Sequence, residues 1–400
     1  MIDSIKRFAV KNKVTYMVIY ICYLLYGICV SLFFLCMRIF PVDDKKIVFA
    51  SSKGRRYGDN PMYISNELLN RKKDYKLVWL LNKNVEEEIP EGVKRVDYTL
   101  KNIIYELVTA KVWVDSNMKE SGLLKRKKQL YIQTWHGSYG LKKVAGDLGN
   151  KLPLIDKRYY KYNAKKTDLM ISNSKRTTEI YRNAFWYYGE VLEYGSPRND
   201  IFFRNTEYVR SKVDKSLGTA GKCIVLYAPT FRNDYRTDDL KLDYGRLLKT
   251  LSDKFDGEWV VLVRLHPNNI SDAEGFIKYT DKIINATNYN IMQELLVAAD
   301  VLITDYSSCM FDFVTTGKKC FIYASDLERY NHERGNYFRM DELPFPLAQN
   351  NDELEKNIKN FNQNKYAVEV KKLFDFVGLN ETGHASEKVA DYIEKWMDEK

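Results

Sequence analysis

Short β-rich runs alternate with helical stretches along most of this chain, and the alternation constrains its fold more than any other feature. The first series of expected strands covers residues 47–51, 76–81, 111–115, 129–134 and 168–172, with helices such as 61–70 and 102–109 between them. An alternation of this kind is typical of a parallel sheet covered by helices. The first half of the chain is therefore predicted to be an α/β domain.

A second series follows a turn-rich stretch, GSPRND, at 195–200. Its expected strands are 223–228, 259–265, 282–285, 301–304 and 319–324, with a helix over 291–299. Because 400 residues exceed one ordinary domain, two sheets in series are expected. We place an N-terminal domain at 41–205, a C-terminal domain at 206–385 and a terminal helix at 386–400.

An uncharged, apolar run at 14–37 precedes the first strand and, as a helix, is long enough to cross a bilayer. Basic residues flank it on both sides, so charge gives no orientation. The flanking residues are Lys6, Arg7, Lys11, Lys13, Arg38, Lys45, Lys46, Lys53, Arg55 and Arg56. A monotopic helix in the cytoplasmic face of the cell membrane satisfies both flanks, so residues 1–40 are predicted to form one. A single span and a buried core helix are the alternatives.

The net charge of +10 predicts attraction to an anion: nucleic acid, a lipid surface or a phosphorylated substrate. The basic residues are dispersed and form no recognised nucleic-acid-binding motif, which argues against nucleic acid. The six cysteines include no CxxC pair, so neither a disulfide framework nor a zinc site is indicated.

Four polar stretches fall where strands are expected to end. They are QTWHGSYGLKK at 133–143, YAPTFRND at 227–234, RLHPNN at 264–269 and TDYSS at 304–308. Ligands of open α/β sheets bind beyond the carboxyl ends of strands. His136 and His266 end strands in different halves, so the two histidines are predicted to face one another across a cleft. A histidine at a strand end can equally cap or pack.

These stretches, with GSPRND and with GHASE at 383–387, resemble the CDP-glycerol glycerophosphotransferase family, the teichoic-acid primases and polymerases of Gram-positive bacteria. The resemblance covers residues 45–390. It implies a GT-B fold of two Rossmann-like domains facing across a cleft. It also implies transfer of a polyol phosphate from a CDP-activated donor, with no metal or other cofactor, at the cytoplasmic membrane face.

The family pattern gives roles to individual residues. The resemblance implies that His136 is the base and that His266 contacts the donor diphosphate. Because phosphoryl transfer moves negative charge onto the leaving group, fixed donors must meet it. The predicted donor and phosphate ligands are Arg232, Arg264, Thr304, Asp305, Ser307, Ser308 and Ser386, and the predicted acceptor ligands are Gly137, Ser138, Lys142 and Lys143. For several of these, capping, loop orientation or a solvated surface position is the alternative.

The predicted reaction transfers glycerol phosphate from CDP-glycerol to a hydroxyl of a membrane-linked acceptor and releases CMP. The expected partners are the CDP-polyol donor, a lipid-linked glycan or polyol-phosphate acceptor and the cytoplasmic membrane. A CDP-ribitol transferase, a GT-B glycosyltransferase using a nucleotide sugar, and a non-catalytic membrane-bound binder of an anionic polymer are the alternatives. Donor choice separates the enzymes, because a UDP-sugar releases UDP. The sequence does not distinguish a primase from a polymerase.

Overall fold

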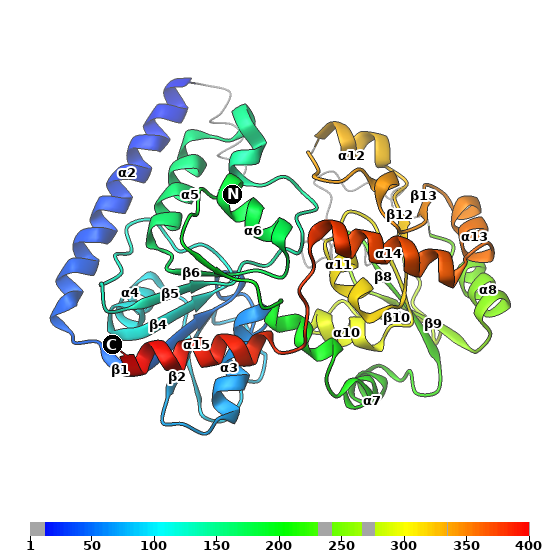
Figure 1. The fold of residues 1–400 in the computed structure, drawn as a ribbon, viewed down its shortest axis with the longest axis horizontal. Helices are drawn as coiled ribbons and strands as arrows, with labels where there is room; N and C mark the ends of the chain where they lie inside the picture. Colours follow the sequence, from blue (N-terminus) through cyan, green and yellow to red (C-terminus); the bar gives the residue numbers. More distant parts are fainter. Residues whose placement is uncertain (1–12, 231–241, 266–276, 334, 400) are drawn as a thin grey trace.

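The computed structural model describes residues 13–230, 242–265, 277–333 and 335–399, and it contains two parallel sheets in two lobes that lie side by side (Figure 1). Short 3-10 turns join several of the elements. They are η1 (Met37–Ile39), η2 (Ser52–Gly54), η3 (Ala145–Lys151), η4 (Pro197–Phe202), η7 (Val314–Thr316) and η8 (Met340–Glu342).

The first sheet has seven strands in the order β3-β2-β1-β4-β5-β6-β7. Their bounds are β1 (Asp43–Ala50), β2 (Lys76–Leu81), β3 (Val93–Asp97), β4 (Ala110–Asp115), β5 (Leu130–Gln133), β6 (Leu169–Ile171) and β7 (Glu190–Leu192). Its helices are α3 (Asp59–Asn70), α4 (Leu100–Thr109), α5 (Leu154–Lys166) and α6 (Lys175–Ala184). The five expected strands are confirmed as β1, β2, β4, β5 and β6. Neither of the two outermost strands, β3 and β7, was predicted.

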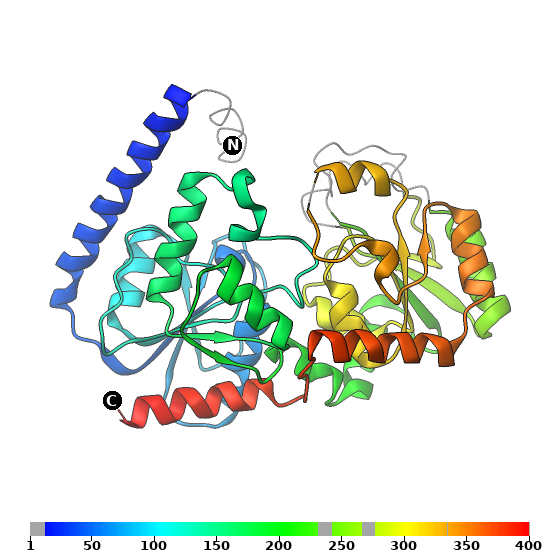
Figure 2. The same cartoon turned by 45° about the horizontal axis from the view of Figure 1, so that its top comes forward.

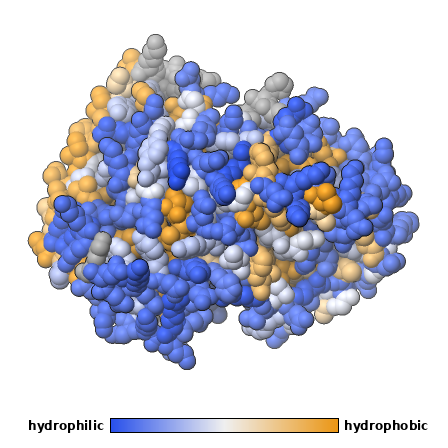
Figure 3. All heavy atoms as spheres, viewed as in Figure 1, coloured by the Kyte–Doolittle hydropathy of each residue, from blue (hydrophilic) through white to orange (hydrophobic). Residues whose placement is uncertain are grey.

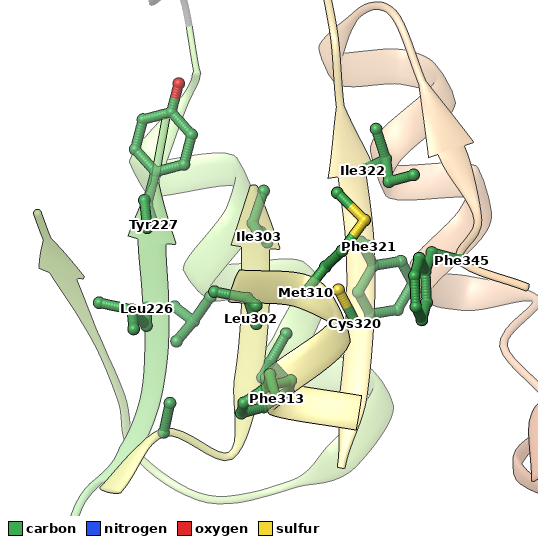
Figure 4. Packing of buried hydrophobic residues seen from close by; sticks show 14 of the residues in the cluster. Leu226, Tyr227, Leu302, Ile303, Met310, Phe313, Cys320, Phe321, Ile322 and Phe345 are labelled. Atoms are coloured by element: carbon green, nitrogen blue, oxygen red, sulfur yellow. The ribbon is translucent and has the colours of Figure 1, made fainter. Parts of the chain in front are cut away.

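The second sheet has six strands in the order β10-β9-β8-β11-β12-β13. Their bounds are β8 (Cys223–Ala228), β9 (Trp259–Val263), β10 (Ile283–Asn285), β11 (Val301–Thr304), β12 (Lys319–Tyr323) and β13 (Leu347–Ala348). Its helices are α7 (Thr206–Leu217), α8 (Tyr244–Phe255), α10 (Met292–Ala298), α11 (Cys309–Phe313), α12 (Leu327–Glu333), α13 (Asn351–Lys359) and α14 (Gln363–Val377). Leu302, Phe313 and Phe321 fill its core, as Figure 4 shows.

Strand order reverses once in each sheet, between β1 and β4 in the first and between β8 and β11 in the second. The chain leaves such a pair of strands in opposite directions, so the loops at their carboxyl ends separate and open a crevice. The two crevices are where the fold offers room for a ligand.

The chain crosses between the lobes twice, through η4 and through the start of α15 (Ala385–Glu399) (Figures 1 and 2). Asp200 joins the two crossings, because its carboxylate accepts the backbone N–H groups of Ala385 (2.9 Å) and Ser386 (2.7 Å). Helix α15 then packs on α3, where Val389 and Ile393 enter the core of the first lobe. The terminal helix expected at 386–400 is thus part of the first lobe's packing. The predicted boundary at 205 falls between η4 and α7.

Helix α2 (Lys13–Cys36) lies along the outer side of the first lobe. Val30 and Phe34 are buried, and the Phe34 ring packs edge-on against Trp113 with 6.2 Å between ring centroids. Gly122 lets the helix approach, because a Cβ there would lie 2.4 Å from the Gly27 carbonyl oxygen. The expected N-terminal helix is therefore present, with one face fixed to the protein.

The opposite face of this N-terminal segment is exposed. The segment Val14–Ile39 is long and apolar enough to span a membrane, and only 11% of its most apolar window is buried. The exposed side chains form the apolar margin seen at the edge of Figure 3. They are Val14, Met17, Val18, Ile21, Leu25, Tyr26, Ile28, Leu32, Phe33, Leu35 and Ile39. The alternative of a buried core helix is therefore excluded.

Candidate active site

A cavity of about 630 Å³ lies between the two lobes, at the switch points of both sheets. Its walls come from the loops that follow β1, β4 and β5 and from the starts of α10 and α11. The lining residues are Ser52, Lys53, Arg55, Arg56, Gly58, Asp59, Asn117, His136, Arg198, Asn290, Ile291, Met292, Gln293, Ser307, Ser308, Cys309 and Asp312. A hollow of about 820 Å³ beside β13 and α14 contains none of the motif residues, so we assign the chemistry to the cavity between the lobes.

His136 follows β5 and lines this cavity. Its Nδ1 lies 3.0 Å from the carbonyl oxygen of Ser116. A carbonyl oxygen only accepts, so Nδ1 carries the proton and donates it. In the neutral imidazole, Nε2 is then the nitrogen with the lone pair, the form that a general base requires. The indole of Trp135 packs against the imidazole, with 4.2 Å between ring centroids, and limits its rotation.

The loop after His136 is anchored to the second lobe. The Ser138 hydroxyl donates a 2.5 Å hydrogen bond to Asp312 on α11. Tyr139 and Leu141 are buried in the core of the second lobe, where the Tyr139 ring packs on Phe311. Because α11 starts directly after Ser308, these contacts fix the position of His136 relative to the serines of the TDYSS stretch.

Arg198 connects the two walls of the cavity and is buried. Its guanidinium pairs with Asp59 from the first lobe (2.8 Å) and with Asp312 from the second (3.0 Å). It also donates to the backbone oxygen of His136 (2.9 Å). Burial acts to lower the pKa of Arg198, but Asp312 and Asp59 outweigh it and raise that pKa, so the charge persists.

Glu381 extends this network and is half-buried. Its carboxylate accepts hydrogen bonds from the Ser196 backbone N–H (3.0 Å) and from the amides of Asn199 (2.8 Å) and Asn173 (3.1 Å). Burial raises the pKa of Glu381 to about 7, although these hydrogen bonds favour the charged form. Glu381, just before the second crossing, is thus tied to the first crossing by partly buried polar contacts.

Of the predicted donor ligands, Ser307 and Ser308 line the cavity. The Ser307 hydroxyl accepts the N–H of Cys309 (3.3 Å). Two others support neighbouring loops: Thr304 donates to the Ala228 carbonyl (2.6 Å), and Asp305 accepts the Thr230 N–H (2.9 Å). Arg264 donates to the carbonyl oxygen of Tyr289 (2.7 Å), next to the cavity wall at Asn290.

The remaining predicted ligands lie at other places. Ser386 is buried at the start of α15 and donates to the Pro197 carbonyl (3.3 Å), away from the cavity lining. Ser138 is buried against Asp312, and Gly137 lies beside the Trp135 indole. Lys142 and Lys143 lie beside Gly335 and Asn336, which follow α12. The Lys143 N–H donates to the Gly335 carbonyl (2.9 Å). The Lys142 ammonium lies 5.7 Å from the centre of the Tyr330 ring.

Arg232 and His266 lie outside the described residues, so the pairing of His136 with His266 stays a prediction. Within the described ranges, no group of three or more His, Cys, Asp or Glu side chains could hold a metal ion. The roles assigned to site residues also stay predictions.

The sequence did not single out the cations of the cavity. Lys53, Arg55 and Arg56 were counted as flanks of the apolar helix, but the whole of β1 separates them from it. Arg198, in the turn-rich GSPRND stretch, also reaches the cavity. The position of SSKGRR directly after a buried strand was the signal that could have identified the first three.

Two doubly wound sheets that share a cationic cavity at their switch points define a two-lobed α/β protein suited to a phosphorylated ligand. Within this class the chain belongs to the family described as CDP-glycerol:poly(glycerophosphate) glycerophosphotransferase, whose model matches residues 32–395. The family resemblance seen in the sequence motifs is thereby confirmed.

Curated relatives include teichoic acid poly(glycerol phosphate) polymerases. The one from Staphylococcus epidermidis is 32% identical over 88% of this chain, which spans only 51% of that relative's length. The one from Bacillus spizizenii is 30% identical over 89% of this chain and 93% of its own length. Among solved structures, the wall teichoic acid polymerase TagF, a histidine variant soaked with CDPG, matches with a TM-score of 0.80 and 31% identity over 90% of each chain.

Proposed function

We propose that this protein transfers glycerol phosphate from CDP-glycerol to a hydroxyl of a teichoic-acid-like acceptor and releases CMP. The observation that carries the proposal is the placement of His136, with Nε2 as proton acceptor, in one cavity with Ser307 and Ser308. Family membership and the polymerase relatives support the donor and acceptor classes. The two lobes are assigned to the GT-B arrangement.

In the proposed reaction, the acceptor oxygen attacks the β-phosphorus of CDP-glycerol and forms the new P–O bond. The bond from the β-phosphorus to the bridging oxygen breaks, and its electron pair leaves with CMP. Nε2 of His136 takes the hydroxyl proton as the oxygen attacks, while Ser116 holds the opposite side of the ring. Hydroxyl donors at Ser307 and Ser308 face the charge that develops on the phosphoryl oxygens.

Product analysis tests this function. The full-length protein is incubated with CDP-glycerol and a synthetic acceptor, and the product is analysed by mass spectrometry. We expect CMP release and an acceptor heavier by one or more glycerol phosphate units. CDP-ribitol and UDP-sugars are supplied in parallel. Ribitol phosphate transfer would change the donor assignment, and release of UDP from a UDP-sugar without CMP release would overturn the function.

Chelation is expected to leave the rate unchanged. We propose that the Ser307 and Ser308 hydroxyls, with the predicted donor ligand Arg264, supply the charge stabilisation that a divalent cation provides in other phosphoryl transferases. CMP release is therefore measured with and without EDTA. A loss of activity with EDTA that added Mg²⁺ or Mn²⁺ restores would show that a metal takes part.

We further propose that α2 anchors the protein monotopically at the cytoplasmic membrane face, where the lipid-linked acceptor lies. One face of α2 is fixed to the first lobe along Val30 and Phe34, so the helix cannot cross a bilayer unless the lobe enters it. The exposed apolar side chains then enter the interface, and nearby basic residues meet anionic headgroups.

Charges on the exposed face of α2 are expected to release the protein from vesicles. In Leu25→Lys/Leu32→Lys, both changed side chains are more than half exposed, so folding is retained while membrane partition weakens. Co-sedimentation with vesicles containing anionic lipid measures this. In the control, Phe34→Ala, stability falls by about 3–5 kcal/mol and vesicle binding persists. Undiminished binding of the double variant would refute the anchor.

A further inference from the structure

The loop after β1 carries three cations in four residues, Lys53, Arg55 and Arg56, and all three line the cavity. Its backbone is held in an unusual conformation, because Ser52 (φ 50°), Lys53 (φ 56°) and Gly54 (φ 75°) are all left-handed. Such conformations are costly for residues other than glycine and persist only where the surroundings fix them.

Contacts on both sides of the loop provide that support. The Gly54 N–H donates to the Ser51 carbonyl (2.9 Å), and its own carbonyl accepts the Asn82 N–H (2.7 Å). Tyr98 packs so closely that a Cβ at Gly54 would lie 2.6 Å from its ring. The loop is thus a fixed structure that presents cations to the cavity.

The charges of the cavity wall do not balance. Its cationic side chains are Lys53, Arg55, Arg56 and Arg198, and its carboxylates are Asp59 and Asp312. Both carboxylates pair with Arg198. Within the part of the chain that the structure describes, no ion pair or side-chain hydrogen bond engages Arg55 or Arg56. The wall therefore has an excess of positive charge close to His136.

Charged groups of both signs lie near Arg56, just outside the cavity lining. Burial raises the pKa of Glu87, and the nearby charge of Arg56 acts against that rise, so Arg56 is partly compensated. On the other side, burial lowers the pKa of Arg264, and the nearby charge of Arg56 acts in the same direction, as expected for two cations close to each other. An anion bound between such cations relieves their repulsion.

We propose that Lys53, Arg55 and Arg56 form a subsite that binds the phosphodiester of a polyol-phosphate acceptor, next to the hydroxyl that His136 deprotonates. This inference rests on the proposed function and names the part of the site that holds the acceptor. The loop and His136 follow β1 and β5 of the first sheet, whereas Ser307 and Ser308 follow β11 of the second sheet. One glycerol unit separates the terminal hydroxyl of such a chain from its preceding phosphate, so an acceptor placed at His136 brings that phosphate to the same wall.

Replacement of Arg55 tests the subsite. Its side chain is exposed, so Arg55→Ala is expected to fold normally. In this variant, the KM for a short glycerol phosphate oligomer used as acceptor is expected to rise about tenfold, because a charge-assisted hydrogen bond is lost. The KM for CDP-glycerol and kcat stay close to those of the unchanged protein. Lys83→Ala, which removes an exposed cation that does not line the cavity, is the matched control and changes neither KM.

A second acceptor identifies the recognised group. In the methyl phosphotriester of the same oligomer the phosphate is neutral, so the unchanged protein and Arg55→Ala are expected to have the same KM. An unchanged KM for the charged oligomer in Arg55→Ala would overturn the subsite. A rise in the KM for CDP-glycerol alone would assign these cations to the donor diphosphate and overturn it as well.

Direct binding separates failure of the subsite from failure of the proposed function. Calorimetric titration of the charged oligomer needs no turnover, and we expect Arg55→Ala to bind it about tenfold more weakly. If the unchanged protein transfers nothing from any CDP-polyol, the function fails, but this titration still tests the subsite. Equal binding by both proteins would refute the subsite whatever the activity.

Discussion

His136→Ala is expected to lower the rate of CMP release by about 100- to 10,000-fold, the usual contribution of a general base. The variant loses Nε2, the proton acceptor that Ser116 orients within the cavity. Because the imidazole is exposed, the thermal midpoint and CDP-glycerol affinity are expected to stay unchanged. A CMP-release assay, a thermal melt and a calorimetric titration measure the three quantities.

His384→Ala is the matched control for this experiment. His384 is also exposed, but it contacts Glu387 (2.9 Å) near the start of α15 and does not line the cavity. Its replacement is expected to leave CMP release unchanged. If His136→Ala were as active as His384→Ala, the assignment of the base would be wrong.

Arg198→Ala is expected to lower the free energy of unfolding by about 3–5 kcal/mol, because it leaves Asp59 and Asp312 as uncompensated carboxylates in a buried place. It also removes the donor to the His136 carbonyl, so the His136 loop loses one of its fixed contacts. Urea unfolding followed by tryptophan fluorescence measures the change.

Arg204→Ala provides the comparison. The Arg204 side chain is 40% exposed and pairs with Glu387 at 3.2 Å, so solvent screens the pair and its loss lowers stability by less than about 1 kcal/mol. If Arg198→Ala lost no more stability than Arg204→Ala, the buried pairs would not be what joins the two lobes.

Apart from β10 at the edge of the second sheet, the strands that were predicted correctly are buried ones. CIVLYA at β8 and KLVWLL at β2 are continuous apolar runs, as expected where helices cover both faces of a parallel sheet. The strands that were missed lie at sheet edges. In VKRVD at β3, three of the five residues are charged and the strand is partly exposed, while β7 and β13 are very short. Their pairing comes from tertiary contacts, which local sequence patterns do not encode.

Residues of the candidate site could likewise be predicted only where a local sequence pattern places them. His136, Ser307 and Ser308 could be predicted, because each follows a recognisable strand. The buried contact between Ser138 and Asp312 could not, since the two residues lie far apart in the sequence and in different lobes. Arg198 has a hinge-like local sequence, and only the approach of Asp59 and Asp312 shows that it joins the lobes.

The structure of His136→Ala bound to CDP-glycerol is the most direct test of where the reaction takes place. We expect the diphosphate in the cavity between the lobes, within hydrogen-bond distance of the Ser307 and Ser308 hydroxyls, with the glycerol phosphate directed toward position 136. CDP-glycerol found elsewhere, for instance in the hollow beside β13 and α14, would contradict this account.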